Sequence, residues 1–359
     1  MAATAVGVFA IALVLVRSGH DKSDVLATAA TTSSTALPST TTTESSTTTE
    51  VPTTAAPLPP STATTKAPAP RKPTPATSAA PRRLVVGAAA LPRSAAAYEG
   101  LGAWVDCFDW SATYSNNKPS VGPADVDRMA SLGVQTIYIQ TSRADAPTDV
   151  LEPERLQPIL DRARQRGIRV VSWYLPTFED QATDVRRMVA AARLSVQSFA
   201  VDIESTKISD AAERGRRLVA ESTALREQLG AGYPIGAIVL PPVATEVINP
   251  NYWPGFPYRQ IAPLYDAWQV MDYFTNRTAA QGYRDAYRYT ADNIDRLRAD
   301  VGIANLPVHV IGGIADKTTP DDVDGMYRAA AERGSPGGSL YDYRTTADAL
   351  WPGMQRFRR

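Results

Sequence analysis

Short apolar runs alternate with longer amphipathic segments from about Tyr98 to Arg359. The short runs are typical of buried strands, whereas apolar residues that recur every three or four positions indicate helices. The predicted strands are Leu101–Phe108, Val134–Thr141, Arg169–Leu175, Ser198–Ser205, Tyr233–Leu240, Ala267–Tyr273, Val308–Ile314 and Gly338–Tyr343. The predicted helices are Ala124–Leu132, Glu154–Arg166, Gln181–Leu194, Asp210–Leu229, a short one near Tyr258–Tyr265, Ala279–Val301, Pro320–Arg333 and Thr346–Phe357.

Several predicted helices end at a glycine, which is favoured at helix C-termini because it adopts the left-handed conformation there. These glycines are Gly133, Gly167, Gly230, Gly302 and Gly334. The repeated order of helix, glycine and short strand indicates parallel βα units, and eight units match a closed (β/α)₈ barrel of about 250 residues. An open doubly wound sheet is the alternative, but no glycine-rich phosphate loop follows the first strand. We therefore predict an α/β protein with a single TIM barrel over residues 96–359.

The N-terminal part of the chain has a different pattern. Ala2–Val16 is a continuous apolar run, shorter than the roughly 20 residues of a membrane span. We predict that residues 1–26 form a signal peptide or a short membrane anchor. Residues 27–95 are rich in Thr, Ser, Pro and Ala and bury too little apolar area to offset ordering, which predicts a disordered linker. Both features predict an exported protein, either secreted or tethered to the cell envelope.

Charge and residue content exclude several function classes. Lys and Arg number 37 and so do Asp and Glu, so nucleic acid is a poor partner. The single cysteine, Cys107, excludes an internal disulfide framework and is expected to be a small buried residue in mid-strand. The two histidines, His20 in the leader and His309 at the start of a strand, exclude a Ser-His-Asp triad and a His-rich zinc site. Because no Walker or dinucleotide motif occurs, we expect no cofactor.

Two acids at the end of the fourth predicted strand carry the candidate chemistry. Strand alternation places Asp202 and Glu204 on the face opposite the bulky apolar residues of Ser198–Ser205. Neighbouring carboxylates resist burial, so an ordinary core strand does not end this way. We interpret them as an active-site acid with a supporting carboxylate. A strand end that surfaces into a solvated loop is the alternative.

Further candidates lie at the ends of other strands, where TIM barrels build their sites. Alternation directs Tyr138 with Gln140, and Met271 with Tyr273, toward the barrel axis, while Asp272 points toward the helices. The candidate substrate-binding residues are Tyr273, Gln140, Met271, Trp173, Tyr174, Asp109, Trp110 and Tyr341. Carboxylates beside aromatic rings suit glycosidic bonds, which paired acids cleave while sugars stack on Trp and Tyr. A carboxylate-bound Mg²⁺ or Ca²⁺ is the less favoured alternative, and we predict no metal site.

At these residues the sequence resembles two families of glycoside hydrolases. Asp202-Ile203-Glu204, together with Met271-Asp272-Tyr273, resembles the D-x-E and M-x-Y pairing of family 18, the chitinases and their relatives. Gly102-Ala-Trp-Val-Asp106, with the same D-x-E, resembles the family 25 lysozymes. Both families are secreted barrels that cleave bonds beside N-acetylated sugars. The resemblance covers the barrel only, and the longer family 18 motif has further acids where this chain has Gln197 and Ala200.

The resemblance implies a role for each matching residue. Glu204 would be the general acid, kept partly protonated by the charge of Asp202. Asp202 and Tyr273 would orient the substrate's acetamido group as an internal nucleophile. Asp106 would be the second carboxylate in the family 25 version, although it could instead bond loop backbone.

Together these features predict an exported, monomeric glycoside hydrolase that acts on peptidoglycan or another polysaccharide. The alternative is a non-catalytic glycan-binding barrel with a degenerate site. Tyr273 and Gln140 could instead be packing residues. Of Trp104, Trp110, Trp173 and Trp268, we expect most to pack in the core rather than to bind sugar.

Overall fold

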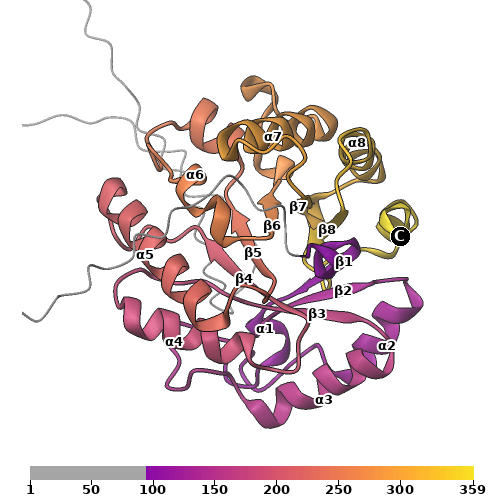
Figure 1. Ribbon diagram of the computed structural model, residues 1–359. Helices are drawn as coiled ribbons and strands as arrows, with labels where there is room; N and C mark the ends of the chain where they lie inside the picture. Colours follow the sequence, from indigo (N-terminus) through magenta and orange to yellow (C-terminus); the bar gives the residue numbers. More distant parts are fainter. Residues whose placement is uncertain (1–93) are drawn as a thin grey trace, which may run out of the picture. The chain divides into compact units, whose positions relative to one another are not determined.

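Eight parallel strands close into a barrel in the order of the sequence in this computed structural model, which describes residues 94–359 (Figure 1). The strands are β1 Gly100–Val105, β2 Thr136–Gln140, β3 Arg169–Tyr174, β4 Ser198–Ile203, β5 Ile235–Val239, β6 Ala267–Met271, β7 Val308–Ile314 and β8 Gly337–Tyr341. The predicted fold class is therefore confirmed. Each strand starts within two residues of its predicted first residue, and all but β7 end one to three residues before their predicted last residue.

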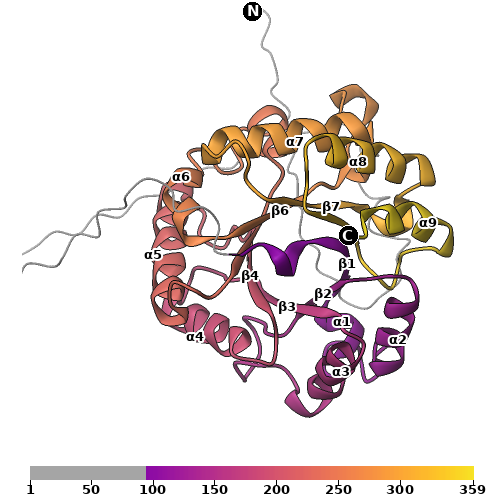
Figure 2. The same ribbon diagram turned by 45° about the vertical axis from the view of Figure 1, so that its right-hand side comes forward.

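Helices connect the strands and surround the barrel. They are α1 Cys107–Trp110, α2 Pro123–Ser131, α3 Pro153–Gln165, α4 Gln181–Ala192, α5 Ala211–Leu229, α6 Tyr258–Ile261, α7 Ala286–Val301, α8 Pro320–Glu332 and α9 Trp351–Met354. Figure 2 shows α2 to α8 as a ring around the strands. The five glycines predicted to end helices all have positive φ angles, between 60° and 84°.

Three local predictions were wrong for identifiable reasons. The segment predicted as one helix over Ala279–Val301 begins with a short 3₁₀ turn, and α7 starts only at Ala286. The Asp285 side chain caps α7 by accepting a hydrogen bond from the Arg288 amide. The segment predicted as one helix over Thr346–Phe357 is divided into two 3₁₀ turns on either side of the four-residue helix α9, with Pro352 in the first turn of α9. Cys107 is buried as predicted but begins α1 rather than lying in mid-strand, because Asp106 caps that helix.

Side-chain alternation along the strands separates an inner core from an outer core. Tyr138, Ala200 and Met271 belong to the cluster inside the barrel, whereas Ile137 and Trp268 pack with the surrounding helices. These orientations confirm the alternation predicted for β2, β4 and β6. Beyond the end of β6, Asp272 turns toward α7, where its carboxylate accepts hydrogen bonds from Asn293 at 2.7 Å and from the Thr290 hydroxyl.

The barrel closes where two glycines face each other, Gly100 in β1 and Gly337 in β8. A Cβ atom on Gly337 would lie 2.3 Å from the carbonyl oxygen of Gly100, which is too close for any side chain. We expect Gly337→Ala to destabilise the fold by about 1–3 kcal/mol, because backbone atoms of a paired strand cannot move aside. Urea denaturation would measure this loss. Gly232→Ala is the control, since a Cβ there meets nothing within 4 Å, and an equal effect of both changes would contradict the closure argument.

The predicted leader, residues 1–26, and nearly all of the predicted linker, residues 27–95, lie outside the described residues. Within residues 94–359, no helix has both the length and the apolar composition needed to cross a membrane.

Candidate active site

The C-terminal ends of the strands surround a cavity with about 670 Å³ of empty volume, which we call the central cavity. This is the end of a TIM barrel at which active sites are built. Its lining consists of acids, an amide, one arginine, aromatic rings and a few aliphatic side chains. These residues are Trp104, Asp106, Phe108, Gln140, Arg143, Trp173, Leu175, Asp202, Glu204, Ile238, Met271, Tyr273, Ile311 and Tyr341.

Asp202 and Glu204 bring two carboxyl groups from β4 into the central cavity. Asp202 is 8% exposed, and its Oδ1 atom has no hydrogen-bond partner among the described residues. Burial raises the pKa of Asp202 well above its usual range, and the charge of Glu204 raises it further. Burial also raises the pKa of Glu204 to about 7. The barrel therefore keeps a protonated acid available near neutral pH, and the cause at Glu204 is burial rather than the charge of Asp202.

Two tyrosines, from the segments that follow β5 and β6, lie near Asp202 and Glu204. Tyr273, which follows β6, is 6% exposed, and burial together with the charges of Glu204 and Asp202 raises the pKa of its phenol. Tyr252 lies in the loop after β5, and its hydroxyl donates to the backbone carbonyl of Glu204 at 3.3 Å. Tyr273 thus presents a neutral hydroxyl near the two acids, while Tyr252 holds the end of β4 in place.

Stacked aromatic rings line the central cavity. Trp104 stacks on Tyr138 with ring centroids 4.5 Å apart and meets Trp173 edge-on at 5.9 Å. Tyr341 lies 6.2 Å from Trp104 and 6.1 Å from Tyr273. The indole nitrogen of Trp173 is buried, and no described residue accepts a hydrogen bond from it. With Asp202 Oδ1, it gives the cavity one unused donor and one unused acceptor, as a polar ligand requires.

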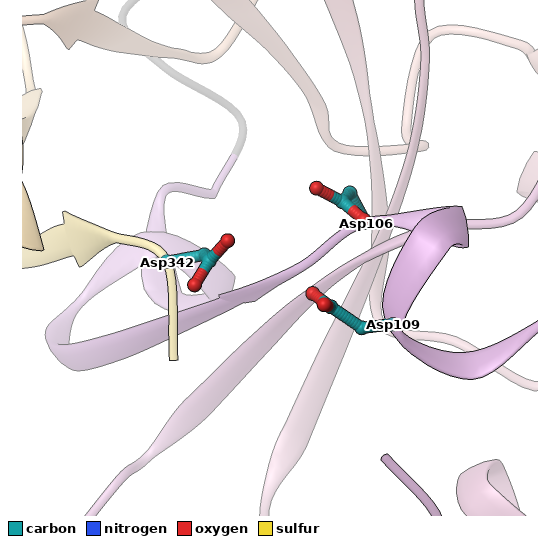
Figure 3. A group of neighbouring side chains, drawn as sticks. All are labelled: Asp106, Asp109 and Asp342. Carbon is teal, nitrogen blue, oxygen red and sulfur yellow. The ribbon is translucent and has the colours of Figure 1, made fainter. Parts of the chain in front are cut away.

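Three aspartates come together beside the central cavity, at the ends of β1 and β8 (Figure 3). One carboxylate oxygen from each of Asp106, Asp109 and Asp342 lies within 4.8 Å of the others. Asp106 caps α1 by accepting from the Phe108 amide at 2.8 Å, and it accepts from the Tyr341 hydroxyl at 3.2 Å. Asp109 pairs with Arg344 at 3.0 Å.

Asp342 accepts from the amide and the hydroxyl of Thr345. Each of the three aspartates therefore has a structural partner in the protein. We assign no metal-dependent step to them.

All but three of the predicted site residues line the central cavity. Tyr174 follows Trp173 in β3, so it points outward, and its hydroxyl donates to Asp184 of α4. Trp110 is fully buried in the outer core and donates to the Gln140 carbonyl at 2.9 Å. Asp109 is the third predicted residue that does not line the central cavity, and it forms an ion pair with Arg344. Of the four tryptophans weighed as sugar platforms, Trp104 and Trp173 line the cavity, while Trp110 and Trp268 pack in the outer core.

Arg143 is a cavity residue that the sequence did not reveal. Its guanidinium lies 5.1 Å from the ring centroid of Phe108 and 4.6 Å from that of Tyr114, and it pairs with Asp145 at 2.8 Å. These residues lie in the segments that follow β1 and β2, where no periodic pattern marks orientation. A basic residue close behind a predicted strand end was the only signal available.

Known proteins resemble the chain in fold. No protein-family model matches the sequence, and no curated protein matches it. The Bacillus cereus spore cortex-lytic enzyme SleL has a TM-score of 0.53 at 10% identity, over 73% of this chain and 74% of that one.

Two chitinases give similar results. The structure from Bacteroides thetaiotaomicron has a TM-score of 0.53 at 10% identity, over 72% of this chain and 96% of that one. A family 18 chitinase from Pseudoalteromonas aurantia has a TM-score of 0.51 at 12% identity, over 71% of this chain and 99% of that one. At such identities the likeness establishes the fold, which is the barrel that the sequence resemblance implied.

Proposed function

We propose that this chain is a glycoside hydrolase that cleaves a polysaccharide of N-acetylated amino sugars in the central cavity. The observation that carries this proposal is the position of Glu204, a half-buried acid with a pKa raised to about 7, beside Asp202 in the wall of an aromatic-lined cavity. Paired carboxyl groups beside aromatic rings are the equipment of glycosidic cleavage. The shared fold with chitinases and with a cortex-lytic enzyme supports the same reaction class.

In the proposed reaction, Glu204 is the general acid. Its carboxyl proton passes to the glycosidic oxygen as the bond to the anomeric carbon breaks. The carbonyl oxygen of the substrate's own acetamido group attacks that carbon and forms a cyclic oxazolinium ion. Asp202 and Tyr273 hold the acetamido group in position for the attack. Water then attacks the anomeric carbon while the Glu204 carboxylate takes its proton. The bond from that carbon to the acetamido oxygen breaks, and the Glu204 acid is restored.

Asp106 has a positioning role in this proposal. Its two oxygens are already used to cap α1 and to accept from Tyr341, whose ring belongs to the cavity wall. We therefore propose that Asp202 is the second carboxyl group of the reaction, beside the general acid Glu204. Asp106, which the resemblance to family 25 lysozymes would put in this role, is not assigned to it.

Location and assembly belong to the same proposal. The apolar leader and the Thr/Ser/Pro/Ala-rich linker of the sequence support export, with the barrel secreted or tethered at the cell envelope. There the barrel would act as a monomer on peptidoglycan or a related polymer.

The direct test is hydrolysis by the full chain. Chitin oligosaccharides and purified peptidoglycan are incubated with the protein, and new reducing ends are followed, with products identified by mass spectrometry. We expect chain cleavage with at least one of the two substrates. Retention on the polymers without any cleavage would instead identify a non-catalytic glycan-binding barrel.

The pH dependence of the reaction follows from the pKa of Glu204. Its raised pKa of about 7 means that the acid is protonated below this pH and ionised above it. We expect kcat to be retained below pH 7 and to fall about tenfold per pH unit well above it, because a general acid must carry its proton. Measuring kcat from pH 5 to pH 9 on a soluble oligosaccharide checks this. A rate that stays constant up to pH 9 would assign the acid role to another group.

A further inference from the structure

A second cavity, which we call the side cavity, adjoins the central cavity at the ends of β5 and β6. It has about 380 Å³ of empty volume and shares two wall residues, Met271 and Tyr273, with the central cavity. Leu240 and Pro241 give it further apolar walls, and Tyr252, which bonds the backbone of Glu204, borders it as well. Because the two cavities share these walls, a substituent on a sugar bound beside Glu204 would point into the side cavity.

Arg277 is the one charged side chain that lines the side cavity among the described residues. It is 7% exposed, and within residues 94–359 its guanidinium has neither an ion pair nor a hydrogen bond, with Nε buried and unpartnered. Its guanidinium carbon lies 5.9 Å from the centroid of the Tyr289 ring. The site therefore holds a permanent positive charge with no anion beside it.

The other buried arginines of the described chain show how unusual this is. Arg187 donates to two backbone carbonyls, Arg214 also donates to two, and Arg226 pairs with Asp266 at 2.7 Å. Burying a charge without a partner is costly, and a distant aromatic ring compensates only a small part of the cost. An uncompensated guanidinium in a cavity is thus a site prepared for an anionic group of a ligand.

We propose that the side cavity is a subsite for a carboxylate carried by the sugar substrate, and that Arg277 binds this carboxylate. The inference rests on the proposed function, because it places the substituent on a sugar bound beside Glu204. A guanidinium matches a carboxylate through two parallel hydrogen bonds. The apolar walls suit the carbon skeleton that carries the acid. The substrate class is therefore an acidic polysaccharide, with the carboxylate on a lactyl ether or on a uronic acid, rather than a neutral chitin chain.

Binding measurements test this subsite without relying on hydrolysis. The full chain carrying Glu204→Gln is titrated by calorimetry with the disaccharide of N-acetylglucosamine and N-acetylmuramic acid, and with the methyl ester of the same disaccharide. We expect the free acid to bind about tenfold or more tightly than its ester, as a charge-assisted pair implies. A third probe, a disaccharide of N-acetylglucosamine and glucuronic acid, tells the two carboxylate sources apart. Preference for either acid over its own ester supports the subsite.

Variants of Arg277 connect the preference to this residue. Added to the same chain, Arg277→Gln should reduce the ratio of the two affinities to about one, while Arg277→Lys should keep part of it because the charge remains. Arg259→Gln removes an exposed arginine outside both cavities and should leave the ratio unchanged. Thermal denaturation of each variant shows that it is folded.

Equal binding of acid and ester by the parent chain, or a preference that survives Arg277→Gln, would overturn the subsite. Because Glu204→Gln is present throughout, these results do not depend on whether the wild-type chain cleaves a polymer. A wild-type chain that cleaves nothing but still prefers the acid would remove the proposed function and leave the carboxylate site standing.

Discussion

Glu204→Gln is expected to lower kcat by about 10²–10⁴-fold on any polymer that the wild-type chain cleaves. The amide has the size of the acid but carries no proton that it can give to the glycosidic oxygen. Burial already disfavours the ionised form of Glu204, as its raised pKa indicates, so a neutral amide should not destabilise the fold. The measurement is kcat on a soluble oligosaccharide, together with the melting temperature of both proteins.

The matched control is Glu227→Gln, which makes the same chemical change at an exposed position of α5. This variant should retain the wild-type rate. If Glu204→Gln cleaves as fast as the wild type while remaining folded, the general acid lies elsewhere and the proposed reaction is wrong. A lower rate caused only by partial unfolding would appear as a lower melting temperature and would not count as support.

The regular parts of the fold were predictable because their signals are local. Alternation along β4 placed Asp202 and Glu204 on the inner face, and the same rule separated Met271 from Trp268 in β6. Parallel βα units have few ways to close, so correct strand assignments were sufficient to predict the barrel and the end that carries the site.

Residues in the loops were not predictable by these rules. Arg143, Tyr252 and Arg277 follow strands and have no periodic neighbours that mark an inner face. Trp110 and Tyr174 show the opposite error, since each is close in sequence to a true cavity residue but points into the outer core or toward α4. Their orientation depends on how loops pack, which one sequence does not specify.

The reason why the pKa of Glu204 is raised could not be predicted from the sequence either. The sequence shows a neighbouring acid, which suggested repulsion, but it does not show depth below the surface. In the folded barrel, the cost of removing the carboxylate from water raises the pKa of Glu204, and the effect of the neighbouring charge falls on Asp202. Desolvation depends on the three-dimensional surroundings and therefore needs a structure.

The two ends of the barrel treat buried charge differently. At the N-terminal end, Arg226 and Asp266 form an ion pair at 2.7 Å with side chains that are 8% and 1% exposed. At the C-terminal end, Arg277 and Asp202 are buried and Glu204 is half-buried, and no ion pair joins this guanidinium to either carboxyl group. Loss of either partner at the N-terminal end would leave a buried charge unpaired, whereas at the C-terminal end the Arg277 guanidinium already lacks an anionic partner and needs a ligand for full electrostatic satisfaction.

Asp266→Ala is therefore expected to lower the free energy of unfolding by about 3–5 kcal/mol, the usual cost of breaking a buried ion pair. The change leaves the Arg226 guanidinium buried without its carboxylate, and it removes the acceptor for the Ile235 amide at 2.9 Å, where β5 begins. Urea denaturation at neutral pH measures the loss.

The control for Asp266→Ala is Asp295→Ala, which breaks an ion pair of similar length, 3.0 Å, between the exposed Asp295 and the half-buried Arg333, and which should cost less than about 1 kcal/mol. Because Asp266 precedes β6 at the end of the barrel opposite the central cavity, the folded fraction of Asp266→Ala should keep the wild-type kcat. Equal costs for the two substitutions would mean that the backbone carbonyls around Arg226, at Leu264 and Tyr233, satisfy its charge without Asp266. In that case, backbone carbonyls alone would satisfy Arg226, as they do Arg214, and Arg277 would still differ because no described residue accepts a hydrogen bond from its guanidinium.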